Sequence, residues 1–95
     1  CIPDTDHLYL GELADTLPQA EARLGATACL VHVDIGSGDE DASRQLGVWL
    51  AGTLPPLLAP GAVLLADQPL PNPDWRSLDL PSGVAAGRYF MYRAR

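Results

Sequence analysis

The sequence predicts an α/β fold built on a mostly parallel sheet. Two apolar runs, Ala28–Val33 and Ala62–Ala66, each end in an aspartate, Asp34 and Asp67. A near-continuous apolar run bounded by turn signals is typical of a strand buried on both faces of a parallel sheet. Between the runs, apolar residues recur at a spacing of three to four, which indicates a crossover helix. We therefore expect Ala28–Val33 to be the central strand.

The segment before that strand predicts a short strand and a helix. His7–Leu10 is the strand candidate, and Gly11-Glu12 closes it. Asp15 or Thr16 can cap a helix whose first turn holds Pro18, a position that suits proline. Gly25 is expected to end this helix.

A second helix is expected after the central strand, followed by an antiparallel strand pair. Asp39-Glu40-Asp41 complements the positive end of a helix dipole, and Pro55-Pro56 stops the helix. Its expected apolar face consists of Ala42, Leu46, Trp49, Leu50 and Thr53-Leu54. Three prolines keep the segment 69–74 irregular, while 75–80 and 88–93 alternate as antiparallel strands do.

Composition excludes several classes of partner. Twelve carboxylates against six arginines give a net charge of −6, which disfavours nucleic acid because phosphate binding needs clustered positive charge. No apolar run is long enough for a membrane span, and the first residues lack the pattern of a signal peptide. Cys29 is expected to pack as a small apolar residue, consistent with a reducing cytoplasm. The start at Cys1 fits a processed protein or the later part of a longer chain.

Asp34 is the first candidate functional residue. In open α/β sheets, ligands bind beyond the carboxyl ends of the strands, where Asp34 stands beside the turn made by Gly36 and Gly38. Asp34 can orient a substrate or act as a general base, and equally can be a turn aspartate. His32, within the same strand, is expected to pack in the core.

The longest distinctive stretch, Leu54-Pro-Pro-Leu-Leu-Ala-Pro-Gly-Ala-Val-Leu-Leu-Ala-Asp67, resembles part of the class I S-adenosylmethionine methyltransferases. It is similar to the helix, Pro-Gly-Gly turn and fifth strand of that family, with Ala62 in place of the second glycine. Leu8–Glu12 resembles the third strand and its following acid, and Val31–Asp34 the fourth strand. The turn Asp-Ile-Gly-Ser-Gly-Asp at 34–39 resembles that of small bacterial members.

This resemblance implies a Rossmann-like three-layer sandwich, the later half of a seven-stranded methyltransferase sheet. It implies S-adenosylmethionine as cofactor, held by Gly11, Glu12, Leu13 and Asp34, with Glu12 accepting from the adenine amino group. Asp34 and Asp67 are the implied catalytic residues. Some family members bind Mg²⁺ through acids at these places, but Gln68 stands where an asparagine is expected, so no metal is predicted and Asp67 is favoured as a turn residue. Read without the family, Glu12 is a solvated acid.

The family's first two strands, with the glycine-rich cofactor loop, have no counterpart in these residues. We expect residues 1–95 to be a single methyltransferase-like domain without its N-terminal cofactor-binding part, which would add roughly 70–90 residues. Since the family's strand order is 3-2-1-4-5-7-6, His7–Leu10 and Ala28–Asp34 should share a sheet without being neighbours.

The expected function is methyl transfer to a small, unidentified acceptor by a cytoplasmic bacterial enzyme. Nucleic-acid and membrane partners are not expected, and a homo-oligomer is left open. The alternatives are a noncatalytic Rossmann-like interaction or dimerisation domain, and a fragment of another nucleotide-binding α/β enzyme.

Overall fold

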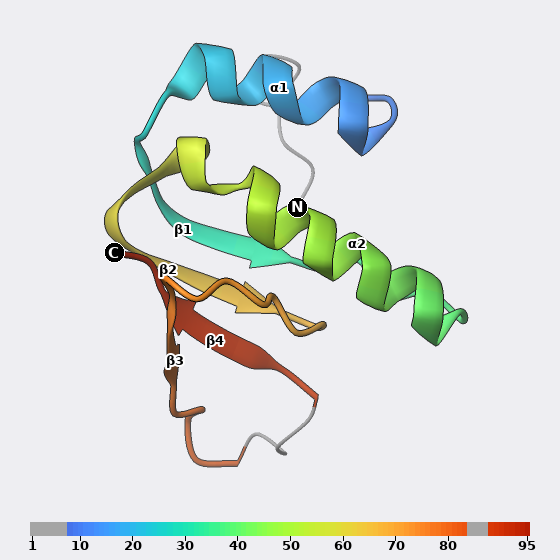
Figure 1. Cartoon of the computed structure of the whole chain (residues 1–95), viewed down its shortest axis with the longest axis vertical. Helices are drawn as coiled ribbons and strands as arrows, with labels where there is room; N and C mark the ends of the chain where they lie inside the picture. Colours follow the sequence, from blue (N-terminus) through green and yellow to red (C-terminus); the bar gives the residue numbers. More distant parts are fainter. Residues whose placement is uncertain (1–7, 84–87) are drawn as a thin grey trace.

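In the computed structural model, which describes residues 8–83 and 88–95, helices and strands follow one another as an α/β chain followed by an antiparallel strand pair (Figure 1). In chain order the elements are α1 (Leu13–Leu24), β1 (Ala28–Val33), α2 (Glu40–Thr53), the 3-10 turn η2 (Pro55–Leu57), β2 (Leu58–Ala66), β3 (Arg76–Leu78) and β4 (Phe90–Arg93). The predicted fold class is confirmed.

The described strands form one mixed sheet in the order β1-β2-β4-β3. β1 and β2 are parallel, with Val31 opposite Leu64 and Val33 opposite Ala66. β4 lies antiparallel between β2 and β3. This order matches the 4-5-7-6 half of the sheet that the family resemblance implies.

One face of the sheet carries the core. Ala62, Leu64 and Ala66 of β2 lie on this face and are almost completely buried. α2 covers the face with small residues as well as large ones, because Ser43, Gly47 and Ala51 are buried beside Leu50 and Leu54. The small side chains let the helix approach closely: a Cβ at Gly47 would lie 2.6 Å from the Pro69 carbonyl oxygen. The expected apolar face is therefore rotated, and Trp49 is 37% exposed.

The proline-rich segment after β2 is irregular, as predicted, but it is well anchored. The Leu70 amide donates to the Tyr92 hydroxyl at 3.0 Å, and the Asn72 side-chain amide donates to the Ala51 carbonyl of α2 at 2.8 Å. Leu70 is buried, and Trp75 packs near Tyr92 with ring centroids 6.3 Å apart. The segment thus completes the core on the same face as α2.

β1, which the sequence predicted as the central strand, borders the described part of the sheet. Within the described residues it pairs with β2 alone, which agrees with the expectation that the family's first two strands have no counterpart in this chain. Leu30 is 71% exposed, and His32 and Cys29 are exposed as well, so the expectation that both pack as core residues is wrong. The physical reason is position: no described strand lies beyond β1, and Leu30 and His32 point to the face opposite α2.

The start of the described chain also differs from the prediction. Leu8–Leu10 form no strand, and His7 lies outside the described residues. α1 begins earlier than expected, with Glu12 rather than Asp15 or Thr16 at its N-cap, which places Pro18 inside the helix. Gly25 ends α1 with φ of 58°, as predicted. No helix within the described ranges has both the length and the apolar character needed to cross a membrane.

Candidate functional site

The turns that follow β1 and β2 lie at one side of the molecule. β1 and β2 run in the same direction, so Asp34 and Asp67, which follow their last residues, stand at the same edge. Figure 1 shows that α1 and α2 also begin on this side. A ligand at this edge would meet strand ends and helix N-termini together.

The Asp34 side chain is exposed and makes no hydrogen bond or ion pair with the rest of the described chain. It follows Val33, a buried residue of β1, and precedes Ile35, which packs against the core. Its backbone is therefore held between two packed residues, and its carboxylate is available to accept a hydrogen bond or a proton from a ligand.

Asp67 has the opposite character. It is half-buried, and both of its carboxylate oxygens accept hydrogen bonds from consecutive amides after β1. Oδ1 accepts from the Ile35 amide at 3.1 Å and Oδ2 from the Gly36 amide at 2.6 Å. The Asp67 amide also donates to the Val33 carbonyl at 3.1 Å. Asp67 therefore ties the end of β2 to the loop that leaves β1.

Gly36 is a requirement of this contact. A Cβ built on Gly36 would lie 2.5 Å from Asp67 Oδ2, which no side chain tolerates without a shift. Gly38, two residues further on, has nothing within 4 Å of such a Cβ. The two glycines of the turn therefore differ. The Asp67 carboxylate leaves no room for a side chain at Gly36, whereas the open space around Gly38 admits one.

A second set of hydrogen bonds holds the other end of the loop on α2. The buried Ser43 hydroxyl accepts from the Ser37 amide at 3.0 Å and donates to the Asp39 carbonyl at 2.9 Å. Asp39 caps the helix, since its Oδ1 accepts from the Ala42 amide at 3.0 Å. The predicted helix start at the acidic run Asp39-Glu40-Asp41 is confirmed, and the loop is fixed at both ends.

Gly11, Glu12 and Leu13 form the entry to α1. Gly11 has φ of 134°, which favours glycine, and the Glu12 carbonyl accepts from the Asp15 and Thr16 amides, both at 3.0 Å. The Glu12 side chain makes no capping bond. Its carboxylate and the first amides of the helix are thus open to a ligand that carries both donors and acceptors. This donor and acceptor set fits the base of a nucleoside.

A cavity of about 310 Å³ opens beside the strand ends. It is lined by Glu40, Arg44, Asp67, Gln68, Pro69 and Phe90. Arg44 is engaged at 2.9 Å with the exposed Asp41. The volume suits a small molecule, and the lining offers an aromatic ring together with polar groups.

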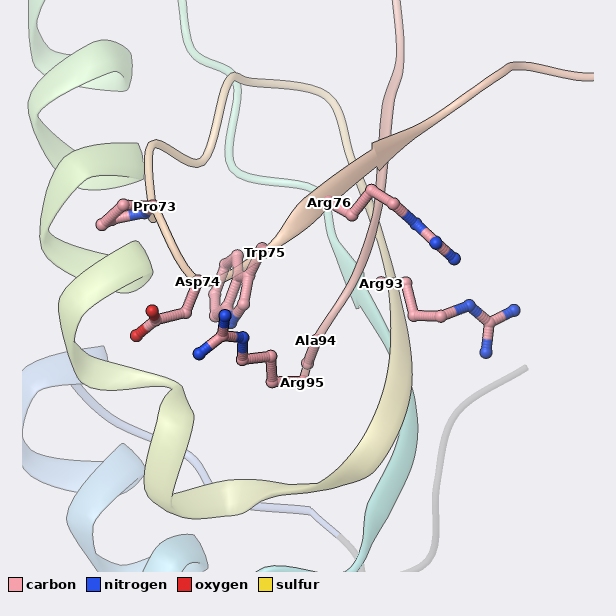
Figure 2. A pocket seen from close by; sticks show the side chains of 7 residues that line it. All are labelled: Pro73, Asp74, Trp75, Arg76, Arg93, Ala94 and Arg95. Atoms are coloured by element: carbon pink, nitrogen blue, oxygen red, sulfur yellow. The ribbon is translucent and has the colours of Figure 1, made fainter.

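A larger cavity, about 400 Å³, lies elsewhere and contains more positive charge. Figure 2 shows Arg76 and Arg93 extending the same way, and Arg95 turned toward Asp74 and Trp75. Trp75 and Arg95 also border a cavity that includes Leu58, the first residue of β2. This region is at the opposite end of the strands from Asp34 and Asp67, so we place the candidate site at the smaller cavity.

The structure places Asp34 and Asp67 side by side, as parallel strand ends require, and Gly11, Glu12 and Leu13 at the helix entry on the same side. Sequence reasoning missed Ile35 and Ser43. The hydrogen bonds of Ile35 come from its backbone, which leaves no mark on residue type. Ser43, a polar residue on the buried side of α2, was a detectable signal because a buried hydroxyl needs a partner.

Comparisons with known proteins agree with one another. The family model described as S-adenosyl-L-methionine methyltransferase matches residues 1–94. The crystal structure of an S-adenosyl-L-methionine methyltransferase from Silicibacter pomeroyi superposes with a TM-score of 0.92 at 32% sequence identity. That alignment covers 99% of this chain and 58% of the other, so the chain spans less than two thirds of that relative's length. No match was found among curated proteins.

Proposed function

Since this chain belongs to the S-adenosyl-L-methionine methyltransferase family, we propose that it takes part in methyl transfer from that cofactor to a small acceptor. The reaction is placed at the carboxyl ends of β1 and β2. The observation that carries this proposal is the exposed carboxylate of Asp34, which forms no hydrogen bond or ion pair in the described chain and stands at the same sheet edge as Asp67, a residue that lines a cavity of about 310 Å³.

When bound, S-adenosyl-L-methionine supplies a methyl group already activated by its sulfonium sulfur, so the protein needs no nucleophile of its own. The work left to the chain is to align the acceptor and to exclude water. In this proposal Asp34 orients the acceptor and accepts its proton where the acceptor carries one. Phe90 and Pro69 offer apolar surface in the neighbouring cavity.

The adenine ring of the cofactor is assigned to the entry of α1. Glu12 would accept from the adenine amino group, and the Leu13 amide, the first in the helix, would donate nearby. Gly11 would let the backbone turn at this point, because its φ of 134° is strained for other residues. The uncommitted Glu12 carboxylate supports this assignment.

The remaining part of the cofactor calls for residues outside these 95. We propose that they form one domain with a preceding segment that provides the glycine-rich loop and a strand beside β1. Two findings support this: the chain covers 58% of its structural relative, and the outer edge of β1 pairs with no strand of the described chain. The same open edge also suits the alternative, a noncatalytic domain that pairs with a second copy.

Calorimetry with S-adenosylhomocysteine on the full-length natural protein tests the proposal. We expect binding, and we expect Glu12→Ala to weaken it by about 1–3 kcal/mol through a lost hydrogen bond. Asp15→Ala is the matched control, since it removes the same charge from the first turn of the same helix. Absence of binding by the natural protein would favour the noncatalytic alternative, and equal affinities of the two variants would remove Glu12 from the site.

A second experiment addresses Asp34. Asp34→Asn should reduce turnover more than the affinity for S-adenosylhomocysteine, because Asp34 acts on the acceptor and not on the donor. A loss of affinity as large as the loss of turnover would instead make Asp34 a cofactor-binding residue.

We also propose that the protein acts in a bacterial cytoplasm. The free, exposed thiol of Cys29 suits a reducing compartment, and the structural relative is bacterial. Fractionation of the source cells tests this: recovery in an extracytoplasmic fraction would contradict it.

A further inference from the structure

We propose that Asp67 is a positioning residue, whose carboxylate fixes the Ile35–Gly36 backbone and thereby the place of Asp34. The role given to Asp34 in catalysis rests on the proposed function. The contact between Asp67 and the loop does not, because it is a property of the fold alone.

The first support is the geometry of the contact. Asp67 Oδ1 and Oδ2 accept from two consecutive amides, at 3.1 Å from Ile35 N and 2.6 Å from Gly36 N. The Asp67 amide donates to the Val33 carbonyl at 3.1 Å, so three bonds from one residue span the backbone on both sides of Asp34. A bidentate, charge-assisted contact of this kind restricts orientation as well as distance.

The second support is the contrast between the two carboxylates. Asp67 has both oxygens engaged and is half-buried, whereas Asp34 is exposed and bonds to nothing in the described chain. If Asp67 moved toward a substrate, the Ile35 and Gly36 amides would lose their acceptor, which costs free energy. Asp34 is free of that cost. Asp67 therefore suits a fixed role, and Asp34 suits the one that touches the ligand.

The third support is the absence of a side chain at residue 36. The carboxylate occupies the space that a Cβ on Gly36 would need, at 2.5 Å from Oδ2. Ser43 holds the loop at its other end through Ser37 and Asp39. Because the loop is fixed at both ends, it needs little rearrangement when a ligand binds. A catalytic carboxylate requires such a preorganised position.

The test compares Asp67→Ala, Asp67→Asn and the control Gly38→Ala in the full-length natural protein. Nuclear magnetic resonance measures backbone order and amide hydrogen exchange at residues 34–36. We expect the Asp34 amide order parameter to fall from about 0.85 to below about 0.6 in Asp67→Ala. Exchange at Ile35 and Gly36 should accelerate about tenfold, the ratio expected for one lost bond. Asp67→Asn keeps one acceptor oxygen and should show a smaller change, and Gly38→Ala should show none.

Turnover supplies the functional arm. Methyl-labelled S-adenosyl-L-methionine is offered with a panel of small acceptors that carry hydroxyl, amine, thiol or carboxyl groups. With any acceptor that is methylated, Asp67→Ala should lower kcat about 10- to 100-fold while S-adenosylhomocysteine affinity stays within about twofold.

Each outcome decides one claim. An unchanged Asp34 order parameter in Asp67→Ala overturns the proposal, and so does lost order with kcat unchanged, which would make Asp67 structural only. If the natural protein neither binds S-adenosylhomocysteine nor methylates any acceptor, the proposed function fails. The order parameters still decide in that case whether Asp67 positions Asp34.

Discussion

The neighbouring parallel strands β1 and β2 follow the same plan in sequence and end up in different surroundings. Each is an apolar run that ends in an aspartate. In β2, Leu64 is completely buried, whereas Leu30 of β1 is 71% exposed. Asp67 accepts hydrogen bonds from two amides, and the Asp34 carboxylate has no partner within the described residues. The comparison teaches that position in the sheet, and not the local pattern, decides what each strand and its acid do.

The physical reason is the number of neighbours. β2 lies between β1 and β4 and has α2 on one face, so its backbone groups and its Leu64 side chain are enclosed. β1 has one strand partner in the described chain and leaves Leu30 and His32 facing away from the core. The end of β2 contacts the loop after β1, while Asp34, at the end of β1, is exposed in the described chain.

The largest expected effect is a difference in unfolding free energy between core variants of β2 and β1. Leu64→Ala should lower the free energy of unfolding by about 2–5 kcal/mol, because it leaves a cavity in a filled core. Leu30→Ala, at a side chain that is 71% exposed in the described chain, should lower it by less than Leu64→Ala does. Urea denaturation of both variants gives the two values. Equal losses of unfolding free energy in the two variants would mean that residues outside the described chain bury Leu30. The contrast between β1 and β2 would then hold for the described residues alone.

The next effect separates the two strand-end acids. Asp67→Ala leaves two amides without their acceptor and should cost about 1–3 kcal/mol of unfolding free energy. Asp34→Ala, which removes the same charge from an exposed position, should cost no more than about 0.5 kcal/mol. Thermal and urea unfolding of the pair measure this difference, and a reversed order would place the structural acid on β1.

A smaller effect concerns the α2 end of the loop. Ser43→Ala removes a buried hydroxyl that accepts from Ser37 and donates to Asp39, and should cost about 1 kcal/mol. Ser82→Ala, at an exposed position, is the control. If Ser43→Ala changes the unfolding free energy as little as Ser82→Ala does, the loop is held by Asp67 alone. The structural difference between Asp67 and Asp34 would then be larger.

Several parts of the fold could be predicted from sequence because their cause is local. β1 and β2 come from apolar β-favouring runs, the start of α2 from the acidic run Asp39-Glu40-Asp41, and the end of α1 from Gly25. The antiparallel pair after β2 came from alternation between polar and apolar residues. Each of these signals lies within a few residues of the structure that it predicts.

The rest depended on contacts distant in sequence. Nothing in Ala28–Val33 itself shows that Leu30 and His32 are exposed in the described chain, since apolar content alone does not reveal how many strands lie beside this one. The rotated face of α2 follows from its approach to Pro69, which favours Gly47 at the contact and leaves Trp49 partly exposed. Asp67 was recognised as a turn residue or catalytic acid, but its bonds to Ile35 and Gly36 join residues more than 30 positions apart.

The most direct test of the account is a double-mutant cycle between Gly36→Ala and Asp67→Ala, read by urea unfolding. The new methyl group would meet Asp67 Oδ2 at 2.5 Å, so Gly36→Ala should cost about 1–3 kcal/mol in the natural protein. In the Asp67→Ala background its cost should fall to within about 0.5 kcal/mol, because the clashing oxygen is gone. Gly38→Ala should show no such coupling. Additive costs for Gly36→Ala and Asp67→Ala would contradict the claim that the acid of β2 is built into the loop that follows β1.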